Sequence, residues 1–234
     1  MDKRFVVALA ALIASFAAAA GLIHVKPTTL VMSPGQSAAV LTVTNNGDKP
    51  ITAQVRVFGW DQVGGKDDLQ STRKVVASPP MATLAPKSSQ SIRVVRVSKE
   101  PVAGEESYRL LVDEIIDPAT APKVGVAVQM RYSVPVFVES AEGKPASVAV
   151  TAEMAGNSLR IKAVNSGGMF AQAADVSLEY AGGKTTPVAD GLLGYVLPGK
   201  TMQWALDVPG NAAASGKPVR MHAKFNGEPF QVDL

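Results

Sequence analysis

Apolar and polar residues alternate at every second position through much of this chain. Residues 37–44 and 51–60 show the pattern most clearly, with valines and other apolar side chains on one parity. Successive side chains of a β-strand point to opposite faces, so this period of two predicts strands with one buried face. The pattern predicts seven strands before residue 139, at 23–32, 37–44, 51–60, 74–77, 91–97, 108–115 and 123–131.

A second group of strands follows the Gly- and Pro-containing stretch 140–145, which has the composition of a domain boundary. Seven short strands separated by turns are typical of an immunoglobulin-like sandwich. The sequence therefore predicts an all-β chain with two sandwich domains, one at 21–138 and one at 139–234. The strands expected in the second domain are 146–152, 158–164, 173–180, 202–208 and 219–225.

The segment 123–131 presents one apolar row. Val124, Val126, Val128 and Met130 fall on one parity, while small or polar residues fall on the other. Such a strand either completes a core of its own domain or forms an apolar edge that another chain shares. The alternation alone leaves both readings open.

The N-terminus has the composition of a secretory signal peptide. Residues 1–20 comprise a basic start, an apolar run and an exit of four alanines. Cleavage after Ala20 would lower the formal charge only from +3 to +2, which is too mild for a nucleic-acid-binding footprint. We expect a soluble protein outside the cytosol, without stable membrane insertion.

Candidate catalytic and metal-binding residues are scarce. The chain has no cysteine and only two histidines, His24 and His222, so a structural zinc site and a cysteine nucleophile are not expected. No nucleophile elbow, phosphate loop or dinucleotide motif is present. We expect no enzyme, no cofactor and no metal. The acidic clusters 66–68 and 104–106 are predicted to lie in solvated loops, and Trp60 and Trp204 to pack in the two cores.

Several segments together resemble one known family. Residues 76–86 with 90–93 resemble the central signature of the periplasmic pilus-assembly chaperones of the chaperone–usher pathway. The stretches 106–115 and 131–138 look like that family's next strands. Residues 165–167 and 194–199 match landmarks of its second domain. The resemblance covers essentially the whole chain after the signal peptide.

The resemblance implies two immunoglobulin-like β-sandwich domains joined by a short linker in a boomerang arrangement. Members of this family bind pilus subunits, which are incomplete immunoglobulin-like pilins, by donating an edge strand, and then deliver them to an outer-membrane usher. Donor-strand addition is an established mode of peptide recognition. Here it would assign Val124, Val126, Val128 and Met130 to the donor strand.

The sequence also departs from the better-known members. Their Arg on the first strand and Lys on the last, which hold the subunit's terminal carboxylate, align with Thr29 and Ser133. The chain therefore resembles the archaic branch, with Csu- or spore-coat-U-type subunits. Other cations would have to anchor the carboxylate. The candidates are Arg93 and Arg96 first, then Arg109 and Arg131.

The alternative is a secreted two-domain sandwich protein that is itself structural or adhesive. A pilin would usually be a single domain with an N-terminal donor extension. Two domains with a long alternating strand between them favour the chaperone over this alternative.

Overall fold

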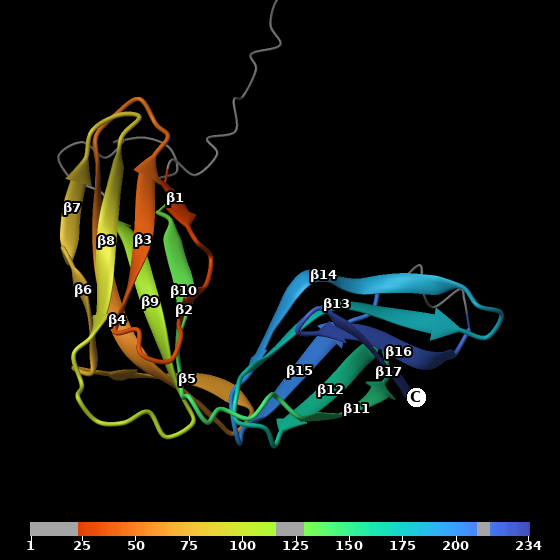
Figure 1. Ribbon diagram of the computed structural model, residues 1–234. Helices are drawn as coiled ribbons and strands as arrows, with labels where there is room; N and C mark the ends of the chain where they lie inside the picture. Colours follow the sequence, from red (N-terminus) through yellow and green to blue (C-terminus); the bar gives the residue numbers. More distant parts are fainter. Residues whose placement is uncertain (1–22, 116–128, 210–215) are drawn as a thin grey trace, which may run out of the picture.

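The computed structural model describes residues 23–115, 129–209 and 216–234. The described residues form two β-sandwiches in sequence order. Figure 1 shows them as two lobes set at an angle and joined at one end, which is the predicted boomerang arrangement. Within these ranges no helix has the length and apolar character needed to cross a membrane.

The first domain consists of two facing sheets. One has the strand order β1-β3-β8-β6, and the other has the order β2-β10-β9-β4-β5, with β7 paired to β4. The strands of the first sheet are β1 (Ile23–Lys26), β3 (Ala38–Asn45), β8 (Ser89–Arg96) and β6 (Val75–Ser78). Those of the second are β2 (Leu30–Met32), β10 (Arg131–Glu139), β9 (Glu105–Ile115), β4 (Ile51–Val63), β5 (Lys66–Ser71) and β7 (Met81–Leu84).

The core of this domain lies between the inward parities of the two sheets. Leu41, Ile92 and Val94 of the first sheet face Leu110 and Val136 of the second, and all are essentially inaccessible to solvent. The alternation in the sequence therefore has its expected physical cause, because each strand buries one row of side chains and exposes the other.

The second domain also consists of two facing sheets, but these have three and four strands, against four and six in the first domain. Its sheets have the orders β11-β12-β15 and β14-β13-β16-β17. The strands are β11 (Val148–Ala155), β12 (Ser158–Asn165), β13 (Ala171–Tyr180), β14 (Thr185–Val196), β15 (Thr201–Asp207), β16 (Pro218–Phe225) and β17 (Glu228–Asp233). The fold class predicted from the alternation, two immunoglobulin-like sandwiches, is confirmed.

The two domains share one structural device that does not appear as a repeat in the sequence. Asn45 and Asn165 end β3 and β12, and both are fully buried. In each case the side-chain oxygen accepts the amide of the glycine two residues on, at 2.9 Å. Each amide nitrogen also donates to backbone carbonyls of neighbouring segments, including Leu84 and Val196. These Asx turns tie a turn to the opposite sheet in both domains.

Two predicted elements differ in the structure. The expected first strand splits into β1 and β2, which lie in different sheets: β1 pairs with β3 and β2 pairs in parallel with β10. Pro27, between them, lacks the N–H needed to continue one ladder. The strand predicted at 51–60 extends to Val63 as β4 and turns back at Gly64 and Gly65, since both glycines have positive φ and β5 pairs onto β4.

The prediction that the two acidic clusters lie in solvated loops is wrong. Asp67 and Asp68 belong to β5, and Glu105 and Glu106 begin β9. Both glutamates are partly buried, because β9 runs through the middle of its sheet.

The two domains meet through aromatic residues. Trp60 and Phe137 of the first domain pack against Phe170, Tyr195 and Leu197 of the second. The Phe137 and Phe170 rings are stacked, with centroids 3.7 Å apart. Trp60 therefore lies at the junction and not in the first core, which corrects its predicted place. Trp204 packs against the second core as expected.

Polar contacts fix the junction at a second point. The buried Gln62 side chain accepts the amide of Leu197 at 2.9 Å and donates to the carbonyl of Tyr195 at 2.9 Å. Lys200 pairs with Asp61 at 2.6 Å. The Gln62 side chain thus bonds the backbone of the second domain as a neighbouring strand would. The two domains are therefore joined by hydrogen bonds as well as by packing.

Candidate functional site

The strand β10 has an edge that is only partly covered. On one side, β9 pairs with its entire length. On the other side, β2 pairs only with Val136, Phe137 and Val138. Among the described residues, the edge from Arg131 to Pro135 therefore has no strand partner.

The hydrogen-bond pattern shows which groups this open edge presents. The amide of Glu114 donates to the carbonyl of Met130 at 3.0 Å, so Met130 directs its backbone toward β9. In an antiparallel ladder the next residues alternate, which turns the backbone groups of Arg131, Ser133 and Pro135 outward. Pro135 has no N–H, which suits an edge position. The edge thus offers two donors and several carbonyl acceptors.

The predicted donor segment, 123–131, precedes this edge in the sequence and overlaps it only at Arg131. Val124, Val126 and Val128 lie outside the described residues, so their assignment stays a prediction. Met130 is described and is partly buried. It shares the parity of Tyr132 and Val134, which pack against the first core.

The outward side of the second sheet carries a group of charged residues beside this edge. We call it the cation face and define it by Arg56, Arg109, Asp113 and Arg131, which the strand register places on the same side. The side chain of Asp113 is only 5% exposed and lies between two guanidinium groups, bonding Arg56 at 2.7 Å and also Arg131. One carboxylate between two cations leaves this cluster with a net positive charge.

The pKa of Asp113 reflects these neighbours. Burial raises its pKa, but the hydrogen bonds from Arg131 and Arg56 outweigh burial and hold it below the ordinary value of 3.8. The carboxylate therefore stays ionised at neutral pH and keeps both guanidinium groups in place.

Arg109 is held differently. Its guanidinium lies 3.6 Å from the centroid of Trp60, and its carboxylate neighbour Asp67 is 3.6 Å away. The side chain is 13% exposed, and burial lowers its pKa. No hydrogen bond from this guanidinium to another described residue is found. Stacking fixes the planar group, and its donors are not bonded to any described residue, which suits the recognition of a carboxylate.

The other two predicted anchors lie on the opposite sheet or inside the sandwich. Arg93 is exposed on the outer side of β8, between Val40 of β3 and Ser78 of β6. No side-chain hydrogen bond or ion pair joins it to another described residue, and it is on the sheet that does not contain β10.

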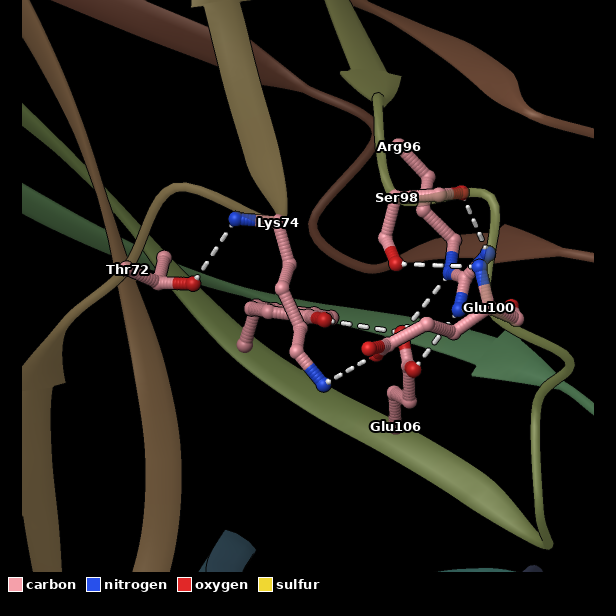
Figure 2. Close-up of polar contacts among 7 residues, drawn as sticks. Thr72, Lys74, Arg96, Ser98, Glu100 and Glu106 are labelled. Atoms are coloured by element: carbon pink, nitrogen blue, oxygen red, sulfur yellow. Dashed lines mark hydrogen bonds and ion pairs between the residues drawn. The ribbon is translucent and has the colours of Figure 1, made fainter.

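Arg96 points inward and is fully engaged. Figure 2 shows its guanidinium directed at the Glu106 carboxylate, with Ser98 and Glu100 beside it. Nε and Nη2 each donate to Glu106 at 2.8 Å, and the backbone carbonyls of Ser98 and Glu100 accept further bonds. Its side chain is only 9% exposed. These surroundings do not support the prediction that Arg96 captures a carboxylate of another chain.

The structure thus brings Arg109 and Arg131 to one face, next to Ser133 of the open edge, and separates Arg93 and Arg96 from it. Sequence reasoning missed Arg56, although it sits on the polar parity of an evident strand. Its position on the polar parity could have been noticed, but arginines are common on the solvated faces of strands, so this position alone does not indicate a site. In the described ranges, no group of three histidine or acidic side chains is arranged to hold a metal ion.

Comparison with known proteins identifies the family. Residues 22–143, about half of the chain, match the model described as "Pili and flagellar-assembly chaperone, PapD N-terminal domain". The chain belongs to this family of assembly chaperones, which are not enzymes. This confirms the family predicted from the sequence.

Individual relatives agree with this assignment. The chaperone protein AfaB of Escherichia coli is 30% identical over 162 residues, which cover 61% of this chain and 62% of that protein. A chain of the CsuC–CsuE chaperone–tip adhesion subunit complex from the archaic Csu pili of Acinetobacter baumannii is 20% identical, with a TM-score of 0.65 over 90% of this chain and 97% of that chain. The Salmonella enterica SafA pilin–SafB chaperone complex gives 18% identity and a TM-score of 0.61 over 91% and 96%.

Proposed function

We propose that this protein is a periplasmic chaperone that binds incomplete immunoglobulin-like pilus subunits by donating an edge strand and delivers them to an outer-membrane usher. The observation that carries the proposal is the open edge of β10 from Arg131 to Pro135. A strand with one unpaired edge is a template for another chain. Family membership makes a pilus subunit the partner that best fits this edge.

The apolar row predicted before β10 supplies the driving force. Burying three valines and one methionine in a subunit's groove would contribute roughly 6–12 kcal/mol gross, before the costs of ordering and association. A strand of about seven residues reaches roughly 23 Å, enough to span one face of a small sandwich. We therefore assign Val124, Val126, Val128 and Met130 to the donated strand.

We further propose that the cation face receives the subunit's terminal carboxylate. Arg109 is the first candidate because its guanidinium is fixed by Trp60 and has no hydrogen bond to another described residue. Arg131 is the second, because it lies on β10 itself and the cluster it shares with Arg56 is positively charged. Arg93, on the other sheet, is too far from β10 in the strand order to share this role.

The missing charges at Thr29 and Ser133 favour the archaic branch of the family, with its Csu-type subunits. Ser133 is exposed on the open edge and Thr29 immediately precedes β2, so both lie beside β10 without supplying a cation. The anchoring charge would then come from β9 and from the first residue of β10.

The test co-expresses the protein with a candidate subunit whose gene lies beside an outer-membrane usher. We expect Val126→Asp and Val128→Asp to abolish recovery of soluble, chaperone-bound subunit, since each buries a charge in the shared groove. Val40→Asp is the matched control: Val40 is a strand valine of the opposite sheet and is 54% exposed. Undiminished subunit capture by both donor-strand variants would rule out strand donation. Delivery is tested by adding the usher and measuring transfer of the bound subunit.

A further inference from the structure

A carboxylate bridges the two domains at the junction. Glu105 is the first residue of β9, and its Oε1 accepts the amide of Phe170, 3.1 Å away in the second domain. Its Oε2 is buried and has no partner at normal hydrogen-bond geometry among the described residues. The hydrogen bond from Phe170 stabilises the ionised form and lowers the pKa of Glu105, but burial is the larger effect and favours the protonated side chain.

A second carboxylate stands directly opposite. Glu139, the last residue of β10, pairs with Glu105 across the ladder. The alternation set by the Met130–Glu114 bond makes this a non-hydrogen-bonded pair, the type in which facing side chains lie closest. Like charges in directly opposed positions repel, and one proton relieves the repulsion.

Among the described residues, no cation is one of the groups that shift the pKa of Glu105. From β9 the neighbouring group is the Ser107 hydroxyl, and from the segment before β13 it is the neutral Phe170 amide. Glu139 is the charged side chain whose field acts on Glu105. Glu139 also lines a cavity of about 600 Å³ with Gly104, Ser140 and Glu142.

We propose that Glu105 acts as a proton-controlled clasp between the two domains, strengthening the junction when it is protonated and loosening it when it ionises. Its consequence for subunit binding rests on the proposed function, because the junction sets the position of the second domain relative to β10. The clasp itself does not depend on a subunit.

The raised pKa of Glu105 determines how the stability of the closed junction depends on pH. Burial is the largest effect, and together with the charge of Glu139 it outweighs the hydrogen bonds from Phe170 and Ser107, raising the pKa of Glu105 from its ordinary 4.5 to about 7. A carboxyl whose pKa is raised by folding loses stabilising effect as pH rises from the unfolded value through the folded value. The closed junction should therefore weaken between about pH 5 and 8, by an upper limit of roughly 300-fold in its opening equilibrium.

The experiment follows the Phe170 amide proton by NMR against pH, using the protein without subunit. We expect a titration with a midpoint near 7. It should be absent in Glu105→Gln, moved to lower pH in Glu139→Gln, and unchanged in Glu142→Gln, a control carboxylate exposed in the linker.

Hydrogen exchange at the same amide measures the clasp. Protection should fall as pH rises from 5 to 8 in the wild type, relative to Glu105→Gln, after correction for intrinsic exchange. A midpoint below 5, or the same titration in Glu105→Gln, would overturn the proposal. If Glu105→Gln does not fold, the proposal is tested by Glu139→Gln, in which the titration midpoint should move to lower pH. Because no subunit is present, these results stand apart from the test of strand donation.

Discussion

Arg96 and Glu106 join the two sheets of the first domain at one end of the sandwich. Their side chains are 9% and 19% exposed, and two bonds of 2.8 Å connect them. The Tyr108 hydroxyl donates to the same carboxylate at 2.8 Å. The hydrogen bond from Arg96 holds the pKa of Glu106 below its ordinary value. Arg96 therefore contributes to the stability of the first domain.

We predict that Arg96→Met lowers the free energy of unfolding by about 3 kcal/mol, because it leaves a partly buried carboxylate without its partner. Arg93→Met, at an exposed position on the same strand, should change it by less than about 0.5 kcal/mol. Urea unfolding measures both. The double variant Arg96→Met/Glu106→Gln should regain part of the loss, and equal effects of the two single variants would contradict this role.

The same pair predicts a pH dependence. Because the folded state lowers the pKa of Glu106, the stabilisation is present above the unfolded value of 4.5 and is lost as pH falls through the folded value. In Arg96→Met this part of the acid sensitivity should disappear. A thermal-unfolding series between pH 3 and 7 checks it, and an unchanged acid profile in the variant would count against the pair.

A further prediction at this scale concerns the anchor. Arg109→Ala should weaken capture of a subunit at least tenfold, since it removes a charge-assisted contact worth about 1.5–3 kcal/mol. Arg93→Ala should leave capture nearly unchanged. A subunit lacking its terminal carboxylate charge should bind both proteins alike. Equal loss in the two variants would move the anchor away from the cation face.

At the scale of elements, β10 has two different edges. Its residues of even number pair with β9, and those of odd number turn their backbone toward the open side. Pro135 already shows that this strand tolerates a residue without an N–H on the odd parity. A substitution at an odd-numbered position can therefore change the open edge without breaking the hydrogen bonds between β10 and β9.

Ser133→Pro tests this separation. It removes an N–H from the open side only, so we expect folding to change by no more than about 1 kcal/mol while subunit binding falls about fivefold to tenfold. Val134→Pro, on the other parity, should break the ladder with β9 and destabilise by about 3 kcal/mol. Thermal unfolding and a subunit-binding titration distinguish them. Normal binding by Ser133→Pro would show that this edge is not shared.

At the scale of the whole molecule, the junction decides how the second domain stands relative to β10. The aromatic cluster around Trp60 and Phe137 supplies packing, and Gln62 supplies direction. A chain of contacts connects this junction to the cation face, because Asp67 accepts from Gln62 at 3.0 Å and lies 3.6 Å from Arg109. The site and the junction are therefore built from the same strands.

Gln62→Ala should release the second domain. It leaves the buried backbone groups of Tyr195 and Leu197 unpaired, at a cost to the junction of about 2–4 kcal/mol. We expect small-angle scattering to show a wider range of domain orientations, while each domain remains folded. Gln231→Ala is the control, since Gln231 is exposed on β17, which pairs with β16 within the second domain. An unchanged scattering profile for Gln62→Ala would show that packing alone fixes the angle.

The alternation of residues by itself determined the fold class. Each strand with a clear apolar row, such as β3, β4 and β12, follows the predicted range within a few residues. The strands that escaped prediction include β5, whose residues are mostly exposed, and β14, which is interrupted by a bulge at Gly191. A period of two is visible only where one face is buried, so strands without a buried row gave no signal.

Only the tertiary structure decided which charged and aromatic residues lie together at the proposed site. Arg96 and Arg109 look alike in the sequence, as arginines within alternating strands. One is sealed between the sheets by Glu106, and the other is stacked on Trp60 beside the open edge of β10. The pattern fixes which face of its own strand a side chain occupies. Which strand lies opposite, and which edge remains uncovered, depends on contacts between residues far apart in the chain, and local alternation carries no information about them.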